Sequence, residues 1–370
     1  MKIDRIEIHL IRVPFDMGAA PSAFGGMAWT SVDSLFVRVR TDDGVDGWGE
    51  GWGHAACPTT RTALETLVAP AVLGRDIGDR NGLMAELFKR LHLHGRPGAA
   101  VHALSALEIA LWDVAGKVAH TPIATLLGGR PRQMRAYASL LRYGDPARVA
   151  EAVERTLKEG FRHLKLHEDN VPAVEAARRA GGDATWIALD TNCPWTVAES
   201  IAMARRLAHL DLAWLEEPVW PPEDHAGLAR VRAAASMPIA AGENLASITE
   251  LQRLLEAGGV DIVQPSVIKF GGIDAVRHGA VLARAHGVDY VPHCFYFGPG
   301  YLASLHLAAA YAPEHPFELF HGKLEASPYH DAVRAKDGMV TVPDGPGLGI
   351  EPDLSVLERY RLAPPVVIEA

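Results

Sequence analysis

The chain has 370 residues, 48% of them hydrophobic, and a formal net charge of −9. This acidic balance, without any lysine or arginine run, argues against nucleic acid as a partner. Its three cysteines, Cys57, Cys193 and Cys294, are too few and too scattered for a disulfide framework or a thiolate metal site. No stretch reaches the roughly 18–20 apolar residues of a membrane span, and the N-terminus does not resemble a signal peptide. We therefore expect a soluble, cytoplasmic protein that does not bind membranes.

The first 50 residues have the pattern of antiparallel β-strands. Apolar side chains recur among polar ones in a run that ends at Leu10 and in a second run that ends at Val39. The second run leads into the turn Asp42-Asp43-Gly44, which is typical of a connection between two strands. The chain is therefore expected to begin with β-structure.

Two segments near these strands are candidates for lids over a small-molecule site. Residues 16–30 are rich in glycine, alanine and proline and include Trp29, and residues 50–54 include Trp52 and His54. Loops with exposed aromatic side chains often close over a ligand, although an ordinary hairpin connection is the alternative for the first segment. We expect Trp29 and His54 to face the substrate.

Residues 60–130 are expected to be helical. Leucines recur at helical spacing in segment 101–117, and two consecutive glycines end the region. Strands followed by helices indicate a separate α+β unit. We therefore place an α+β domain at residues 1–130, with a boundary near Pro131.

The next part of the chain repeats one pattern, in which a polar residue ends each short apolar run. Seven such residues follow one another at intervals of 23 to 27 residues, and the run 134–140 lies one period earlier. Helical patterns between the runs, such as 197–210 and 275–286, indicate βα units. Eight parallel strands, each followed by a helix, close into a (β/α)8 barrel whose active site lies where the strands end. The residues that end the runs are His167, Asp190, Glu216, Glu243, Ser266, His293 and Glu318.

The barrel is expected to occupy residues 131–335. A chain of 370 residues exceeds a minimal barrel by about a hundred, which agrees with a second domain. Residues 338–350 predict a strand followed by a rigid loop with three glycines and two prolines. We expect the C-terminal segment, residues 336–370, to return to the N-terminal domain.

Three carboxylates end three consecutive predicted strands: Asp190, then Glu216 beside Glu217, then Glu243. Like charges that converge at the mouth of a barrel repel one another unless a cation binds them. The alternative is that polar residues merely mark the start of loops. Oxygen ligands without a cysteine are typical of Mg²⁺, with Mn²⁺ as a substitute, rather than of zinc. We therefore predict one Mg²⁺ site.

In combination, these motifs resemble the enolase superfamily, specifically its mandelate racemase-like branch. The resemblance implies an α+β capping domain, a modified TIM barrel with one Mg²⁺, and abstraction of the proton α to a substrate carboxylate. It also assigns the second metal ligand to Glu216, the first glutamate of its motif. The motifs are Lys165-Leu166-His167, Asp190 in LDTN, Glu216-Glu217-Pro218, Glu243 in AGEN, Gly271-Gly272, His293 and Glu318, with the segments 103–117 and 341–351.

Lys165 and His167 alternate on one predicted strand, so both side chains can point into the site. The family pattern at these positions is usually Lys-x-Lys, with the second lysine as the base. The second residue here is His167, and histidine, whose unperturbed pKa is about 6.5, is a competent base at neutral pH. We expect Lys165 to hold the substrate carboxylate. A surface imidazole beside a solvated lysine is the alternative.

His293 occupies the position of the base on the opposite face. The family supports that imidazole with an aspartate at the end of the sixth strand, where this chain has Ser266. A serine hydroxyl can fix a tautomer, but it supplies no negative charge to stabilise an imidazolium. We therefore expect His293 to be a poorer base and a better proton donor, which favours β-elimination over racemisation.

The remaining candidates would contact the substrate. Glu318 is expected to hydrogen-bond the substrate carboxylate or its enediolate in a protonated form, although a structural role is the alternative. Lys269 resembles a supporting lysine of the family. Aromatic side chains after strands more often pack than recognise ligands. The predicted substrate-binding residues are Lys269, Asn192, Ser266, Trp29, His54 and Tyr296.

The leading hypothesis is a Mg²⁺-dependent dehydratase that acts on a hydroxylated carboxylic acid, namely an acid sugar such as an aldonic or aldaric acid. His167 would abstract the α-proton and His293 would protonate the departing hydroxyl. The alternatives are a racemase, epimerase or cycloisomerase with the same groups, and a carboxylate-binding relative without catalysis. The resemblance also implies a homo-oligomer.

Overall fold

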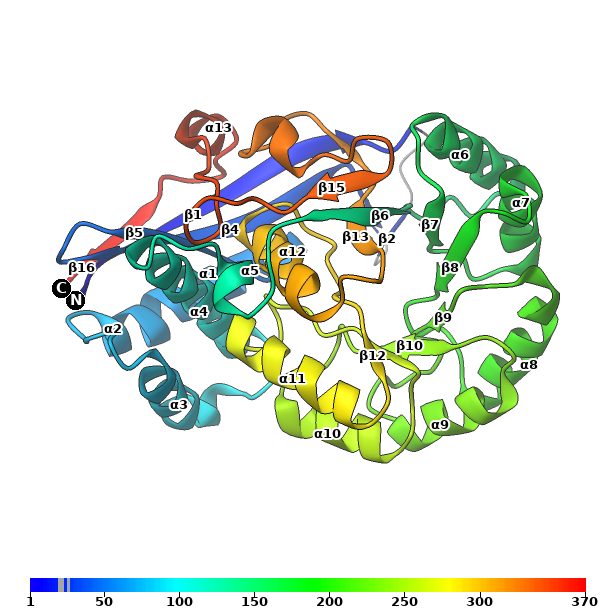
Figure 1. Cartoon of the computed structure of the whole chain (residues 1–370), viewed down its shortest axis with the longest axis horizontal. Helices are drawn as coiled ribbons and strands as arrows, with labels where there is room; N and C mark the ends of the chain where they lie inside the picture. The colour runs from blue at the N-terminus through cyan, green and yellow to red at the C-terminus, as the bar shows by residue number, and fades with distance from the viewer. Residues whose placement is uncertain (19–22, 25–26) are drawn as a thin grey trace.

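The computed structural model describes residues 1–18, 23–24 and 27–370. It shows an N-terminal sheet with helices on one side of the molecule and a ring of parallel strands on the other (Figure 1). The predicted lid at residues 16–30 lies partly outside the described residues. Its described part contains the short strands β2 (Ala23–Phe24) and β3 (Met27–Ala28).

The N-terminal sheet combines strands from both ends of the chain. Its strands run in the order β14-β1-β4-β5, and the C-terminal strand β16 pairs antiparallel with β1. Ile8 of β1 lies opposite Val37 of β4, so the apolar positions of the two strands coincide. The two termini accordingly lie close together (Figure 1). The strands are β1 (Ile3–Asp16), β4 (Ser31–Thr41), β5 (Asp46–Gly51), β14 (Lys323–Leu324) and β16 (Val366–Glu369).

Helix α4 (Ala99–Val118) packs along this sheet, and most of its side chains are buried. With a mean hydropathy of 1.3 in its most apolar window, α4 is long and apolar enough to span a membrane, which the sequence analysis did not anticipate. However, 83% of that window is buried inside the protein, as in the core helix of a globular fold. The other helices of this unit are α1 (Cys57–Ala63), α2 (Ala69–Val72), α3 (Arg80–Arg90) and α5 (Ile123–Leu126).

Eight parallel strands form the ring, which confirms the predicted barrel-like fold. They pair in the order β12-β11-β10-β9-β8-β7-β6-β13, and β15 (Met339–Thr341) adds an antiparallel strand to β6. Among these described strands, β12 and β13 are not paired with each other, so the ladder is open there. The strands are β6 (Gln133–Ser139), β7 (His163–Leu166), β8 (Trp186–Asp190), β9 (Leu215–Glu216), β10 (Ile239–Ala241), β11 (Ile262–Val263), β12 (Asp289–Tyr290) and β13 (Phe317–Phe320).

Seven helices connect the eight strands. The expectation of a helix after every strand was wrong at β13, which is followed by β14 and a short 3-10 helix, His330–Val333. The chain leaves the ring at this point because β14 joins the N-terminal sheet. The helices are α6 (Pro146–Lys158), α7 (Val171–Gly181), α8 (Val197–Leu207), α9 (His225–Ala234), α10 (Ile248–Glu256), α11 (Ile273–Ala285) and α12 (Pro299–Tyr311), and α13 (Leu354–Arg359) follows near the C-terminus.

The core runs without interruption from the N-terminal sheet into the ring. One buried apolar cluster includes Phe36 and Trp48 of the sheet, Trp112 of α4, and Leu164 and Ile187 of the ring strands. Because these side chains share one core, the two parts of the molecule are held in a fixed relation. The site described next lies at the carboxyl ends of the ring strands.

Candidate active site

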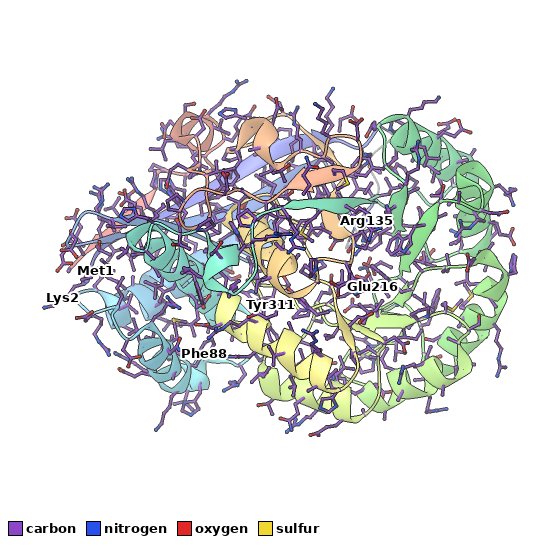
Figure 2. All side chains as sticks on the ribbon, in the orientation of Figure 1. Met1, Lys2, Phe88, Arg135, Glu216 and Tyr311 are labelled. Carbon is purple, nitrogen blue, oxygen red and sulfur yellow. The ribbon has the colours of Figure 1, made fainter. Side chains whose placement is uncertain are left out.

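The three predicted metal ligands come together inside the ring. Asp190 and Glu216 end β8 and β9, and Glu243 follows β10. One oxygen from each carboxylate lies within 4.8 Å of the others. Asp190 and Glu216 are buried and Glu243 is partly buried. Figure 2 shows Glu216 inside the ring of strands. Neighbouring parallel strands thus bring together side chains that are more than 20 residues apart in the chain.

Lys165 on β7 is fully buried and lies at the centre of the acidic groups. Its Nζ lies 3.2 Å from Asp190, 3.0 Å from Glu216 and 2.8 Å from Glu318. Burial alone would lower the pKa of Lys165, but Glu216, Glu318 and Asp190 together hold that pKa well above its usual value. The lysine is therefore a permanent positive charge beside the three carboxylates.

Two further donors fix the orientation of Glu216. Trp214 Nε1 and Gln264 Nε2 donate to Glu216 Oε2 at 2.9 and 3.0 Å, whereas Oε1 faces Lys165. Burial, with the adjacent Asp190, raises the pKa of Glu216 to about 8. A carboxyl whose pKa is raised in this way favours a proton, which a bound cation would replace. A set of oriented carboxylate oxygens fits a hard divalent cation such as Mg²⁺.

His167 lies at one edge of this cluster. Its Nδ1–H donates to the carbonyl of Leu140, and its Nε2 lies 3.3 Å from Asp190 Oδ2. A neutral imidazole that donates through Nδ1 has its lone pair on Nε2, the atom that faces the site. The carbonyl of Leu140, just after β6, thus holds His167 with Nε2 toward the site, where the neutral imidazole would offer the lone pair that a base requires.

His293 lies at the opposite edge, and its Nε2 is 2.7 Å from Glu243 Oε2. An imidazole that close to a carboxylate donates its Nε2–H. Within the described residues, Nδ1 of His293 is buried without a hydrogen-bond partner. The expectation that Ser266 could fix this tautomer was wrong, because Ser266 Oγ donates to Tyr296 Oη at 3.4 Å. His293 therefore carries its proton toward the site.

Glu318 on β13 is buried beneath Lys165. Its carboxylate accepts hydrogen bonds from Ser139 Oγ at 2.8 Å and from the Cys294 N–H at 2.6 Å, in addition to the ion pair with Lys165. Burial would raise the pKa of Glu318, but Lys165 and His293 outweigh burial and lower it. The expected protonated form is therefore not the one that this environment stabilises. The ionised Glu318 orients Lys165 and the residue after His293.

Lys269 lies beside Glu243, at the carboxylate oxygen that does not face His293. Its Nζ is 3.8 Å from Glu243 Oε1, 3.3 Å from Asn244 Oδ1 and 4.7 Å from the centre of the Trp52 ring. Asn244 Nδ2 in turn donates to both oxygens of Glu217, at 2.9 and 3.1 Å. Glu217 is thus held behind the metal-ligand cluster by an amide.

Asn192 contacts the cluster through its backbone. Its N–H donates to Asp190 Oδ1 at 2.9 Å, and its φ of 53° places it in the left-handed region that asparagine tolerates. This contact orients the carboxylate that ends β8. The prediction that the Asn192 side chain contacts substrate stays a prediction.

Aromatic rings form a wall next to His167. Phe295 lies 5.6 Å from the His167 ring, 5.5 Å from Trp29 and 4.9 Å from Phe320, measured between ring centres. The His54 ring lies 5.2 Å from the Trp29 ring, so both residues of the predicted lids reach this wall. Burial lowers the pKa of His54 to about 4, so His54 is neutral at physiological pH. The side of the site next to His167 is therefore apolar.

Tyr296 was predicted to bind substrate, but its hydroxyl hydrogen-bonds other groups of the protein. Its hydroxyl donates to the carbonyl of His293 at 3.0 Å and also contacts Ser304 Oγ at 3.0 Å. The hydroxyl that was expected to bind substrate is thus engaged with the protein. It ties the segment that carries His293 to helix α12.

Several residues that support the site were not predicted from the sequence. Gln264 precedes Ser266 by two positions at the end of one strand, so period-two alternation could have placed it inside the ring. Ser139 ends β6 in the same way, where it reaches Glu318. The carbonyl of Leu140 and the N–H of Cys294 leave no signal in a sequence, because every residue has these groups.

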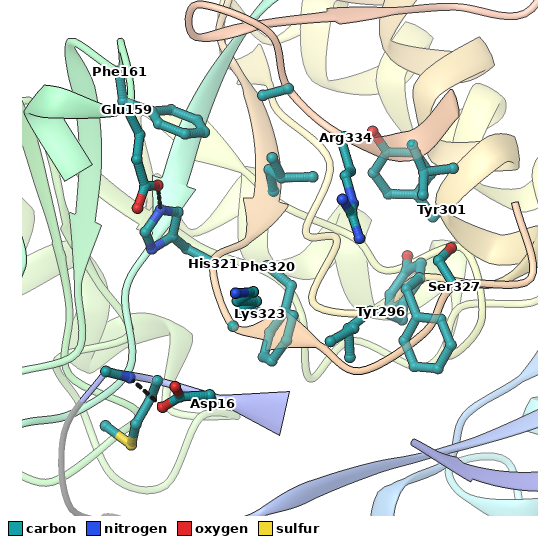
Figure 3. Close-up of a pocket in the computed structure, with 18 of the residues that line it drawn as sticks. Asp16, Glu159, Phe161, Tyr296, Tyr301, Phe320, His321, Lys323, Ser327 and Arg334 are labelled. Carbon is teal, nitrogen blue, oxygen red and sulfur yellow. Dashed lines mark hydrogen bonds and ion pairs between the residues drawn. The ribbon is translucent and has the colours of Figure 1, made fainter. Parts of the chain in front are cut away.

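A cavity of about 480 Å³ lies away from the triad, between α6 and the segment after β13. Figure 3 shows the His321–Glu159 ion pair on one side of this cavity and Arg334 and Tyr301 on the other. Of the predicted site residues, Tyr296 lines it. The carboxylates, Lys165 and the two imidazoles define the candidate active site better, since their chemistry converges there.

Comparison with known proteins agrees with this geometry. Residues 8–128 match the N-terminal domain model of mandelate racemase and muconate lactonizing enzyme, and residues 148–356 match the enolase C-terminal domain-like model. The chain is 34% identical to D-galactarolactone cycloisomerase of Agrobacterium fabrum, over 99% of this chain and 100% of that protein. It is 33% identical to D-galactonate dehydratase of Ralstonia nicotianae, over 89% and 92% of the two chains.

A solved structure has the same architecture. A racemase from Streptomyces coelicolor A3(2) with bound magnesium superposes with a TM-score of 0.87 at 30% identity, over 97% of this chain and 100% of that one. The two family models together match most of the chain, which confirms the resemblance seen in the motifs. The chain therefore belongs to the enolase superfamily, within the mandelate racemase and muconate lactonizing enzyme family.

Proposed function

We propose that this protein is a Mg²⁺-dependent enzyme that removes the proton α to a carboxylate and eliminates water from a hydroxylated carboxylic acid, such as an acid sugar. One observation carries the proposal. Two imidazoles flank one carboxylate triad from opposite edges, His167 at Asp190 and His293 at Glu243. A substrate held at the triad would lie between a base and an acid.

Asp190, Glu216 and Glu243 would hold the cation. When bound, it would supply positive charge for the substrate carboxylate and for the negative charge that develops as the α-proton leaves. Lys165 adds a second positive charge within 3.2 Å of two of these ligands. Its position suits the same developing charge, and the buried setting strengthens the attraction.

The hydrogen bonds of the two imidazoles suit different steps. His167 donates Nδ1–H to Leu140, so Nε2 accepts the α-proton. His293 presents Nε2–H, and as an imidazolium it would donate that proton to the departing hydroxyl and become the neutral imidazole. The product would be an enol that becomes a 2-keto-3-deoxy acid. Racemisation, in contrast, would require matched bases on the two faces.

A cycloisomerase is the second candidate, because the chain aligns over 99% of its length with D-galactarolactone cycloisomerase. Such an enzyme would use the same proton transfer, with a ring oxygen instead of water as the leaving group. The aromatic wall of Trp29, His54 and Phe295 beside His167 also suits a substrate with an apolar face. A homo-oligomeric assembly, which the family resemblance implies, is part of the proposal.

The deciding experiment incubates the protein with Mg²⁺ and a panel of acid sugars and their lactones in D₂O, and follows substrates and products by NMR. A dehydratase yields a 2-keto-3-deoxy acid with net loss of water. A cycloisomerase yields an isomer of unchanged mass. Deuterium in both α-epimers without water loss would contradict the dehydratase, and tight binding without turnover of any compound would favour a non-catalytic relative.

A further inference from the structure

Five of the seven helices between the ring strands begin at a cap from their own loop. In each, a side chain just before the helix accepts an N–H of the first turn, which otherwise lacks an intrahelical partner. Helices α11 and α12 begin instead at Gly272 and Gly298, which have no side chain to serve as a cap. The five caps are Asp145, Asn170, Thr196, Asp224 and Ser247.

Helix α11 obtains its cap from α4 of the N-terminal domain. Glu108 on α4 is buried, and its carboxylate accepts hydrogen bonds from Ile273 N at 2.6 Å and from Asp274 N at 3.0 Å. Gly272 has a φ of 91°, and a Cβ there would lie 2.0 Å from Glu108 Oε2. Because residue 272 is a glycine, the Glu108 carboxylate can reach the start of α11.

Helix α12 obtains its cap from β5 of the same domain. Glu50 is 1% exposed, and its Oε2 accepts a hydrogen bond from Gly300 N at 2.9 Å. The hydroxyl of Ser34 on β4 donates to the other oxygen of Glu50. A Cβ on Gly298 would lie 2.5 Å from Glu50 Oε2. The start of α12 is therefore shaped to accept this one carboxylate.

Glu50 connects two segments that face the candidate active site. It precedes Trp52 and His54 in the chain, whose rings lie 4.8 Å apart at the aromatic wall. The helix that it caps follows His293 by a few residues, and Tyr296 between them donates to the carbonyl of His293. A shift at the start of α12 would therefore move the imidazole that we assign as the proton donor.

We propose that Glu50 is a positioning residue for His293: by capping α12 from the N-terminal domain, it fixes the segment that presents the His293 imidazole to the substrate. This inference rests on the proposed function, in which His293 is the proton donor. His167 directly follows β7, between α6 and α7, which have caps in their own loops, so its placement does not depend on Glu50. Loss of the Glu50 cap should therefore impair proton donation more than proton abstraction.

The test compares Glu50→Leu and Glu50→Gln with the matched control Asp145→Ala. Asp145 accepts from Ala147 N at 3.0 Å and from Arg148 N at 3.1 Å, so its loss removes a cap of the same kind from α6, far from His293 in the chain. For each protein, with Mg²⁺ and an acid sugar that the wild type converts, deuterium exchange at the α-carbon of unreacted substrate is measured against product formation.

We expect the ratio of exchange to product formation to rise by about 10- to 100-fold in Glu50→Leu, because a small misplacement of a catalytic group has effects of that size. Glu50→Gln keeps one acceptor oxygen and should give a smaller rise. The ratio should stay at the wild-type value in Asp145→Ala. A wild-type ratio in Glu50→Leu, or an equal rise in Asp145→Ala, would overturn the proposal.

Amide hydrogen exchange supplies a readout that does not need activity. The N–H of Gly300 should lose protection in Glu50→Leu, lose less of it in Glu50→Gln, which keeps one acceptor oxygen, and keep it in Asp145→Ala. If Glu50→Leu does not fold, Glu50→Met, which also lacks an acceptor oxygen, replaces it, and wild-type protection of Gly300 in that variant overturns the cap. If the wild type exchanges no α-proton with any acid sugar, the proposed function fails, whereas the amide measurement still tests the cap.

Discussion

The two sides of the strand ring differ in what holds them in place. From β6 to β10, strands pair continuously and each following helix starts at a cap in its own loop. That side carries Lys165, His167 and the three metal-ligand carboxylates. From β11 to β13, the ladder is open between β12 and β13, and Glu108 and Glu50 of the N-terminal domain supply the caps.

This difference matches the division of the proposed chemistry. Cation binding and proton abstraction depend on the side from β6 to β10, whose helices have caps in their own loops. This side must hold several carboxylates of like charge close together. Proton donation by His293 depends on the side that the N-terminal domain completes. In this proposal the N-terminal domain is therefore a structural part of the catalytic site.

The largest expected effects come from the two imidazoles. His167→Ala should lower kcat by about 10²- to 10⁴-fold and also abolish α-proton exchange, because it removes the base. His293→Ala should lower product formation by a similar factor but leave exchange measurable. NMR in D₂O reports both rates. Equal loss of exchange in the two variants would contradict the assignment of base and acid.

His306 gives a pH-dependent test of how α12 is anchored. Its Nδ1 accepts from Ala124 N, and its Nε2–H donates to the carbonyl of Leu348, both at 3.2 Å. Burial lowers the pKa of His306 to about 4, below the ordinary value near 6.5 of the unfolded chain. The stability that it contributes is thus complete above about pH 6.5 and is lost as pH falls toward about 4.

That loss should reach on the order of 3 kcal/mol by linkage. Urea unfolding of the wild type and of His306→Gln, at a series of pH values across this window, measures it as the difference between the two proteins. The wild type should lose stability more steeply with acid. Parallel curves for the two proteins would show that His306 is not neutral in the fold.

Gly272→Ala tests the close approach of Glu108 to α11. The new Cβ would meet Glu108 Oε2 at 2.0 Å on a backbone with φ of 91°, so we expect a loss of about 2 kcal/mol or more in the free energy of unfolding. Gly287→Ala, at the other end of α11, is the control: its φ is 68° but a Cβ there meets nothing within 4 Å. A smaller loss, near 1 kcal/mol, is expected for it.

The smallest effect is expected from the cap of α6, on the side of the ring from β6 to β10. Asp145→Ala should cost about 1 kcal/mol of unfolding free energy, the usual value of an exposed N-cap, without changing Mg²⁺ affinity. Chemical denaturation and calorimetric titration with Mg²⁺ measure the two quantities. A change in Mg²⁺ affinity would show that this side of the ring is less independent than the comparison implies.

The strand ring and the ligand triad could be predicted because each parallel strand ends in one polar residue at a regular interval. Spacing therefore predicted a convergent set of Asp190, Glu243 and one acid of the Glu216-Glu217 pair, and the family resemblance selected Glu216. His167 was likewise predicted from its alternation with Lys165. These inferences need only local pattern and the geometry of a closed ring.

The features that could not be predicted depend on contacts between distant segments. Glu50 and Gly300 are 250 residues apart, and Glu108 and Ile273 are 165 apart, so no local pattern connects them. The protonated Glu318 was a wrong expectation because the Cys294 N–H and Lys165 both favour its ionised form. The helix expected after β13 was also wrong, because that segment pairs with β1 instead.

The most direct test of the account follows the α-proton signal of an acid sugar in D₂O with the wild type and Asp190→Asn, each with and without Mg²⁺. The account predicts that the signal disappears with the wild type and Mg²⁺, and persists when either the cation or the Asp190 carboxylate is removed. Disappearance of the signal in Asp190→Asn, or in the wild type freed of divalent cations, would contradict it.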